Sequence, residues 1–332
     1  MKKGMLRKWS ATGPLVAFFF FGANALPGEN QTASPAVTSS QALKLSGYGQ
    51  FLYTAQDPGL DGFSLHRMRL SLEGEVMKNF QYKLQVDAVR NPILLDAQID
   101  IFFHEAATLR VGQFKVPFSQ ENLASDADIY TINRAQPVLK LAPGHDIGSS
   151  GRDIGAILTG KTSFIEYAVG VFNGAGINKA DTNEDKDWAG RLVVHPASFL
   201  TLAASFYNGR YSPTPNDAPV KRDRAGLDLA FHYDAFSLRG EFIQASDGAI
   251  LKNGWYLQAG YFFLPKKLQG VIKVDAYDKD TSASLDRTNQ WTVGLNWLLA
   301  EKLKLQINFE LYKDESGATI NKAFLVQFQA GF

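Results

Sequence analysis

Apolar and polar residues alternate one by one over long stretches of this chain, from Leu43 to the C-terminus. In the last stretch, Phe324, Val326 and Phe328 alternate with Gln327 and Gln329. A period of two residues is that of a β-strand with two unlike faces. The stretches run for about ten residues or more, as membrane-spanning strands do, whereas strands in soluble proteins average roughly five or six. Repeated along a chain, such strands predict a large antiparallel sheet that is apolar on one side.

The connections between these stretches differ systematically in length. We count sixteen candidate strands, with short turns expected near residues 77–79, 104–106, 161–163, 195–198, 233–235, 265–267 and 300–301. Most connections at the other end are longer, as at 173–186, 208–221, 278–286 and 314–321, although 56–62 and 90–92 are short. Short turns at one end and long loops at the other are typical of bacterial outer-membrane barrels. An even strand number places both ends of the barrel on the short-turn side.

Aromatic residues and overall polarity favour the same fold. Aromatics make up 12% of the chain and gather near strand ends, as expected for the two girdles of a membrane barrel. The mean hydropathy of −0.15 and the lack of a long apolar run after the N-terminus exclude a bundle of membrane helices. Closure into a barrel also removes sheet edges, which lipid does not tolerate. We therefore predict an all-β transmembrane antiparallel β-barrel of about sixteen strands over residues 42–332.

The N-terminal region differs from the rest. Residues 1–25 combine a basic start, a short apolar core and a small-x-small site at Ala23 to Ala25, which predicts a secretory signal peptide rather than a buried N-terminal helix. Residues 26–41 are polar and rich in Ser, Thr and Pro, which predicts a disordered periplasmic lead-in. The leader holds four of the 34 basic residues and no acidic one, which leaves 30 basic against 33 acidic residues. No basic excess points to nucleic acid.

One connection is far longer than the others and runs from residue 114 to residue 151. It contains Ile129, Tyr130, Ile132, Val138 and Leu139, so it is less polar than a disordered loop. Long loops inside compact folds are usually functional or disordered. We expect this segment to fold into the lumen and narrow it as a constriction loop. The alternative is an exposed extracellular flap.

Five segments resemble the phosphate-selective porin family of Gram-negative outer membranes. They are RMRLSLEGEVMKNFQYKLQVD (67–87), LRVGQFKVPFSQEN (109–122), GRDIGAIL (151–158), GVFNG (170–174) and DWAGRLVVHP (187–196). The resemblance implies a sixteen-stranded homotrimeric porin, a constriction formed after the fifth strand, and uptake of phosphate or other anions. The acidic-Arg pair of that family's constriction loop reads Asn133-Arg134 here, and its basic ladder is diluted. The resemblance therefore supports the fold more strongly than it supports phosphate specificity.

A channel of this kind selects its solute by charges fixed close to the path. Charged side chains are cheaper inside the barrel than on its lipid face, so the basic residues of the polar faces are candidates for an anion path. Arginine suits phosphate because its planar fork makes two parallel hydrogen bonds to an oxyanion. The candidates on the strands, and on or beside the long segment, are Arg67, Arg69, Lys83, Arg110, Lys115, Arg134, Lys140, Arg152 and Arg224.

A different interpretation of these cations is that they pair with acids across the barrel wall and choose no substrate. The candidate lumen acids are Glu73, Asp87, Asp96, Asp100, Glu166, Asp228, Glu241, Asp275 and Glu310. Pairing is expected for most single arginines. The anion-path interpretation is favoured for Arg67, Arg69, Arg110 and Arg134, where the constriction should lie.

Three other functions remain open at this point. A barrel enzyme would need a histidine beside a nucleophile or acid, and the five histidines lie in turns, near strand ends or singly in the long segment. A soluble β-sandwich adhesin predicts neither girdles nor loop asymmetry. A plugged barrel that only anchors a surface structure would share the whole pattern. We expect a passive outer-membrane porin in a Gram-negative bacterium, with lipid and small anions as partners and with no cofactor, metal site or catalytic residue.

Overall fold

The computed structural model describes residues 43–332 and forms sixteen strands and two short helices. The expected signal peptide and periplasmic lead-in lie outside the described residues. The strands are Lys44–Asp57 (β1), Gly62–Met77 (β2), Phe80–Asp87 (β3), Leu94–His104 (β4), Ala107–Lys115 (β5), Arg152–Lys161 (β6), Ile165–Phe172 (β7), Asp187–Ala197 (β8), Leu200–Tyr211 (β9), Val220–Tyr233 (β10), Phe236–Asp247 (β11), Ile250–Leu264 (β12), Leu268–Asp278 (β13), Arg287–Ala300 (β14), Leu303–Asp314 (β15) and Thr319–Gly331 (β16). The helices are Gln120–Leu123 (α1) and Gln136–Leu141 (α2).

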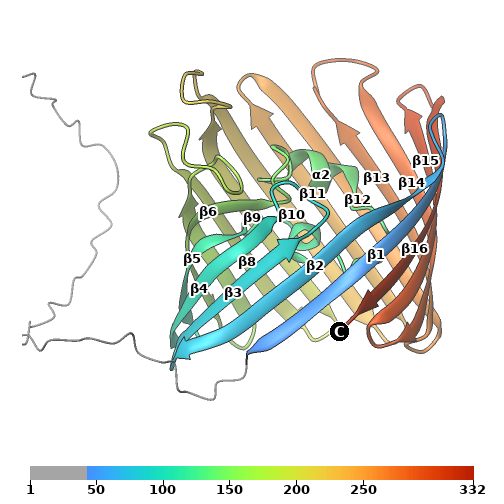
Figure 1. Cartoon of the computed structure of the whole chain (residues 1–332). Coiled ribbons are helices and arrows are strands. Elements are labelled where there is room, and N and C mark those ends of the chain that lie inside the picture. The colour runs from blue at the N-terminus through green and yellow to red at the C-terminus, as the bar shows by residue number, and fades with distance from the viewer. Residues whose placement is uncertain (1–42) are drawn as a thin grey trace, which may run out of the picture. The chain divides into compact units, whose positions relative to one another are not determined.

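The strands close into one antiparallel barrel in which each strand pairs with its neighbours in sequence (Figure 1). Closure comes from β1 and β16, whose pairing runs from Tyr48 opposite Gly331 to Asp57 opposite Lys322. The C-terminus lies at the same rim as the start of β1 (Figure 1). The predicted all-β barrel of sixteen antiparallel strands is confirmed, and its even strand number brings both ends of the wall to one rim.

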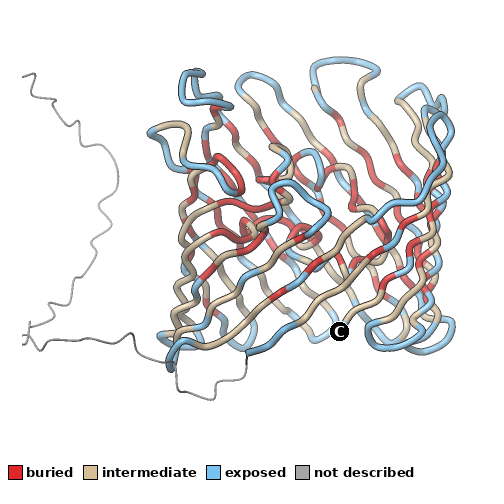
Figure 2. Tube along the Cα trace, in the orientation of Figure 1, coloured by how far each residue is buried: buried red, intermediate tan, exposed pale blue. Residues whose placement is uncertain are grey.

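The two faces of the wall differ as the alternation predicts. Leu227 and Phe324 are exposed, whereas Asp228 and Gln327, on the opposite face of the same strands, are buried. Exposed positions concentrate in the loops and turns at the two rims, and buried positions recur along the wall strands and in the long segment (Figure 2). Because the barrel is closed, the buried polar side chains face its interior and the exposed apolar side chains face outward. Among the described residues, no helix is both long and apolar enough to cross a membrane.

The wall is not equally tall all the way round. Five consecutive strands, β3 to β7, have 8, 11, 9, 10 and 8 residues. Their neighbour β2 has 16 residues, and β12, on another part of the wall, has 15. We call β3 to β7 the low wall. It lies directly beside the start of the long segment, which leaves the wall after β5 and returns at β6.

Candidate functional site

The long segment occupies residues 116–151, since β5 continues through Lys115 and β6 begins at Arg152. Its backbone is held by polar side chains of the wall. Asn296 of β14 donates to the carbonyl of Tyr130 at 2.8 Å, and Lys304 of β15 donates to that of Ala127 at 2.6 Å. In return, the Ile132 N–H donates to the Asn308 side chain at 2.6 Å. The polar row of β14 and β15 therefore provides the hydrogen bonds that a buried loop backbone requires.

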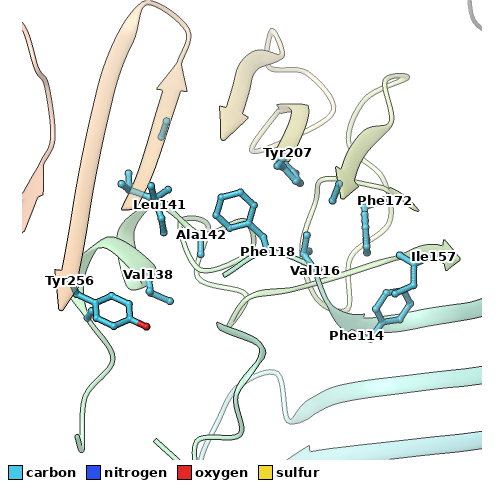
Figure 3. Close-up of a cluster of buried hydrophobic side chains, with 14 residues drawn as sticks. Phe114, Val116, Phe118, Val138, Leu141, Ala142, Ile157, Phe172, Tyr207 and Tyr256 are labelled. Atoms are coloured by element: carbon cyan, nitrogen blue, oxygen red, sulfur yellow. The ribbon is translucent and has the colours of Figure 1, made fainter. Parts of the chain in front are cut away.

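Apolar packing holds the same segment against the next part of the wall. Val138 and Leu141 of α2 are fully buried in a cluster that includes Ile243, Ala245 and Tyr256 of β11 and β12 (Figure 3). Fully burying each large apolar side chain contributes about 1.5–3 kcal/mol. The segment is therefore fastened by a small hydrophobic core as well as by polar contacts, which a mobile surface flap would not form.

Three of the candidate arginines meet at one carboxylate of the segment. Asp126 lies 2.5 Å from Arg69 and 2.8 Å from Arg134, and 3.6 Å from Arg67. We call Arg67, Arg69 and Arg134 the arginine cluster. Burial alone would raise the pKa of the Asp126 carboxyl, but Arg134, Arg69 and Arg67 outweigh burial and hold that pKa well below its usual range. Asp126 is therefore ionised throughout the physiological pH range.

Asp126 was not among the expected site residues, although the segment's sequence ASDAD contains it. Alternation identifies inward side chains only on strands, and it carries no information about a loop. The useful signal would have been the presence of acids in a segment expected to lie beside several arginines. Asp146, whose side chain in the same segment is only 7% exposed, was missed for the same reason.

Four of the remaining candidate cations are paired with acids, as the alternative interpretation predicts for most of them. Arg152 contacts Asp96 at 2.5 Å and Arg224 contacts Asp146 at 2.8 Å, and both guanidinium groups are almost fully buried. Arg110 contacts Asp100 at 2.6 Å and Lys83 contacts Glu73 at 3.3 Å, yet their side chains are 34% and 32% exposed. Lys140 is exposed on α2. Arg110 and Lys83 can therefore meet a solute, whereas Arg152 and Arg224 are occupied in fastening the structure.

Lys115 differs from all of these. Its ammonium donates to the carbonyls of Asn122 and Ala124, both at 2.7 Å. No carboxylate of residues 43–332 forms an ion pair with it. A carbonyl dipole stabilises a cation but does not cancel its charge. Lys115 is therefore a basic group without a carboxylate partner where β5 meets the segment.

Two cavities adjoin at this point. The larger, about 620 Å³, lies between β2 to β6 and the segment, and the smaller, about 400 Å³, extends towards β7 and β8. Both are lined by Arg110, Lys115 and Leu123. The lining of the larger cavity includes six basic residues and four acidic ones: Lys44, Arg69, Lys83, Arg110, Lys115 and Arg152, with Glu73, Glu75, Asp96 and Asp100.

The acidic and histidine side chains of the barrel form contacts of other kinds. Residues 43–332 contain no group of three or more His, Asp or Glu side chains placed to hold a metal ion. His195 lies 3.3 Å from Glu166 and 3.0 Å from the Thr201 hydroxyl, near a turn. His66 contacts Gln327 at 2.7 Å and Arg67 at 3.2 Å. These contacts fix side chains within the wall.

The comparisons with known proteins agree with this geometry. A family model described as phosphate-selective porin O and P matches residues 46–223, and no curated protein matches the chain. An anion-selective porin from Comamonas acidovorans aligns with a TM-score of 0.69 and 14% identity, covering 88% of this chain and 100% of that one. A trimer form of OmpT from Vibrio cholerae has a TM-score of 0.65 and 10% identity, covering 89% and 100%. The channel DcaP of Acinetobacter baumannii has a TM-score of 0.60 and 12% identity, covering 91% and 100%.

At these identities the solved structures show a shared fold, while the family match shows the relationship. The matched residues make up more than half of the chain and include the low wall, the long segment and the return strand β6. Family and fold together point to a channel rather than to an enzyme. The chain belongs to the phosphate-selective porin O and P family and is an outer-membrane porin.

Proposed function

We propose that this porin lets small anions, phosphate among them, diffuse across the outer membrane of a Gram-negative bacterium. The proposed path follows the two adjoining cavities between the low wall and the segment 116–151, which acts as the constriction. The observation that carries the proposal is Lys115, a basic residue without a carboxylate partner that lines both cavities. Arg110 and Lys83 add partly exposed positive groups along the same side.

The expected selectivity is moderate. Barrels of about sixteen strands leave an aqueous channel, and fixed charges near the path then decide which ions enter. Here the larger cavity has only a small basic excess, and most of its arginines are paired with carboxylates. The mixture supports a preference for anions over cations rather than exclusive passage of one anion. The family's description and the name of the Comamonas acidovorans porin support the same class of solute.

The proposal is tested by the reversal potential of single channels under a KCl gradient in planar bilayers. We expect the wild type to favour chloride, and Lys115→Gln to shift the reversal potential towards that of a non-selective pore, because one net charge near the path is lost. Lys266→Gln is the matched control, since it removes the same charge from the exposed turn between β12 and β13.

Each other outcome contradicts part of the proposal. A cation-side reversal potential in the wild type would keep the porin and reject anion preference. An equal shift in both variants would show that only overall charge matters and that Lys115 does not line the path. Absence of conductance would favour a plugged barrel that serves as an anchor.

We further propose that the chain is exported with residues 1–25 as a signal peptide and assembles as a homotrimer. The low wall supports a contact between copies. A membrane-spanning strand needs about 9–11 residues, and β3 and β7 have 8 each. Their outward side chains include exposed Leu84 and Val169. A second copy would cover this surface better than lipid, because neither short strand spans the full apolar layer.

A further inference from the structure

The arginine cluster has the composition of a site for an oxyanion. Three guanidinium groups converge on one point, and the group at that point is the carboxylate of Asp126. Arg69 also donates to Asp87 at 3.1 Å, and Arg67 donates to the Gln50 side chain at 2.7 Å. Three positive charges therefore face two carboxylates, and Lys115 lies close enough to influence Asp126. The cluster retains a positive excess after all of its ion pairs are counted.

The cluster also has unused hydrogen-bonding capacity. Arg134 is about 5% exposed, and its Nη1 has no hydrogen-bond partner among the described residues. Its Nη2 donates to Asp126 at 2.8 Å and to the carbonyl of Ala124 at 2.9 Å. A carboxylate offers two oxygens, whereas phosphate offers four in a tetrahedron. Asp126 therefore neutralises the cluster in part and leaves one guanidinium donor, the Nη1 of Arg134, without a partner among the described residues.

A solute can reach this place from the larger cavity. The cavity of about 620 Å³ is lined by Arg69 of the cluster and by Leu123 and Ser125, the latter adjoining Asp126 in the chain. Asp126 itself is about 6% exposed. Arg69 thus borders the cavity directly, and the Asp126 carboxylate that binds it lies just behind the cavity wall.

We propose that Asp126 is an internal anion that fills a three-arginine oxyanion site and so keeps the passage from binding phosphate tightly. The proposal rests on the proposed anion path and adds a residue that sets specificity within it. With Asp126 in place, phosphate must compete with a tethered carboxylate that is always present. Without the charge of Asp126, the same three arginines would be balanced only by Asp87, which contacts Arg69, and would bind a tetrahedral oxyanion that enters from the cavity.

The test replaces Asp126 with asparagine, which keeps the size of the side chain and removes its charge. Each charge-assisted hydrogen bond transferred to phosphate is large enough to change affinity by roughly ten-fold or more. We therefore expect Asp126→Asn to show half-block of chloride current at a phosphate concentration about ten-fold lower than the wild type. We also expect inorganic phosphate to raise the thermal stability of Asp126→Asn in detergent and to leave that of the wild type nearly unchanged.

Asp146→Asn is the matched control. Asp146 is also a buried carboxylate of the segment, and it accepts from Arg222 at 2.9 Å and Arg224 at 2.8 Å. Neither arginine lines the larger cavity. If phosphate stabilises or blocks Asp146→Asn as strongly as Asp126→Asn, any unpaired buried arginine suffices and the proposal is wrong. If phosphate acts only on Asp126→Asn, the site is the one behind the cavity wall.

Further outcomes separate this inference from the proposed function and from a loss of fold. Larger conductance in Asp126→Asn without phosphate binding would mean that Asp126 only fastens the segment, and would overturn the inference. A wild type that favours cations would reject the proposed function, while phosphate stabilisation of Asp126→Asn would still be measurable.

If Asp126→Asn does not assemble, the double variant Asp126→Asn with Arg134→Gln removes one charge of each sign. This double variant must still be blocked by phosphate more strongly than the wild type, or the inference fails.

Discussion

Lys115 and Arg152 are neighbours across the β5–β6 pair, yet only one of them can act on a solute. The Arg152 guanidinium is 2% exposed and is bound to Asp96 and to the Gln85 side chain. The Lys115 ammonium has only carbonyl partners and lines both cavities. The two residues differ because of the groups that they bind, and not because one is a lysine and the other an arginine. A list of basic residues on inward faces therefore overstates how many determine selectivity.

The pH dependence of stability provides a test at the residue scale. Because the folded-state pKa of Asp126 is well below its usual range, its ion pairs stabilise the folded porin fully above the ordinary Asp pKa. Their contribution is lost only as pH falls through the depressed folded-state value. Removing one partner of a buried ion pair costs about 3–5 kcal/mol. In phosphate-free detergent, we expect Asp126→Asn to melt below the wild type by a constant margin from pH 7 down to about pH 4.5.

Below about pH 4 this margin should narrow, because the Asp126 carboxyl of the unfolded chain then takes up a proton while that of the folded wild type stays ionised. Melting curves followed by loss of β-sheet circular dichroism at several pH values would measure the margin. A margin that vanishes already near pH 6 would show that the pKa of Asp126 is raised, and that the three arginines do not act on it as the geometry indicates.

At the scale of elements, the long segment is held by two kinds of contact on different parts of the wall. Polar side chains of β14 and β15 bind its backbone, and α2 packs into the cluster of β11 and β12. The arginine cluster adds a third attachment, near β2. Because these contacts bring the segment against β10 to β16, the space beside the low wall stays open. The position of the proposed path follows from where the segment is fastened.

A charge introduced at a buried position of α2 should detach this helix from the apolar cluster of β11 and β12. We expect Val138→Asp to give larger and noisier single-channel currents, because an unpaired carboxylate in an apolar cluster costs several kcal/mol and would drive α2 out of the cluster. Leu139→Asp is the control on the same helix, since Leu139 is 40% exposed whereas Val138 is fully buried. Equal currents in Val138→Asp and the wild type would contradict a role of α2 in narrowing the channel.

For the whole molecule, the unequal height of the wall is the feature with the clearest consequence. Outer-membrane barrels turn an apolar band towards lipid, and this chain does so with long strands such as β12 and β14. The low wall does not reach the same length. The asymmetry is the basis of the proposed contact between copies at the low wall.

Cross-linking tests this assembly directly, because the chain has no cysteine and single cysteines can be introduced cleanly. We expect Leu84→Cys and Ile99→Cys on the low wall to give cross-linked dimers and trimers with a short bis-maleimide in native outer membranes. Leu257→Cys on β12 is the control, since its side chain is exposed to a similar degree on the tall wall. Cross-linking of Leu257→Cys alone would place the contact on the opposite side of the barrel.

The sequence by itself determined the barrel, because strand period, strand length and loop asymmetry are local properties that each stretch of chain carries. It also located the long segment and most of the basic residues that line or support the cavities. It did not determine their partners. A bulge between β1 and β2, opposite Gln50 and Phe51, disturbs strict alternation, so His66 reaches Gln327 although its neighbour Arg67 also faces inward.

Only the tertiary structure decided which charges remain free. Asp126 and Asp146 reach the arginines from a segment without periodicity, across sequence separations that no local pattern encodes. Arg224 is thereby bound to the segment, and Lys140 is left exposed on α2. Lys115 remains without a carboxylate partner where the two cavities adjoin. The physical reason is that the effect of a charge depends on what lies within a few ångströms of it in space, which folding alone brings together.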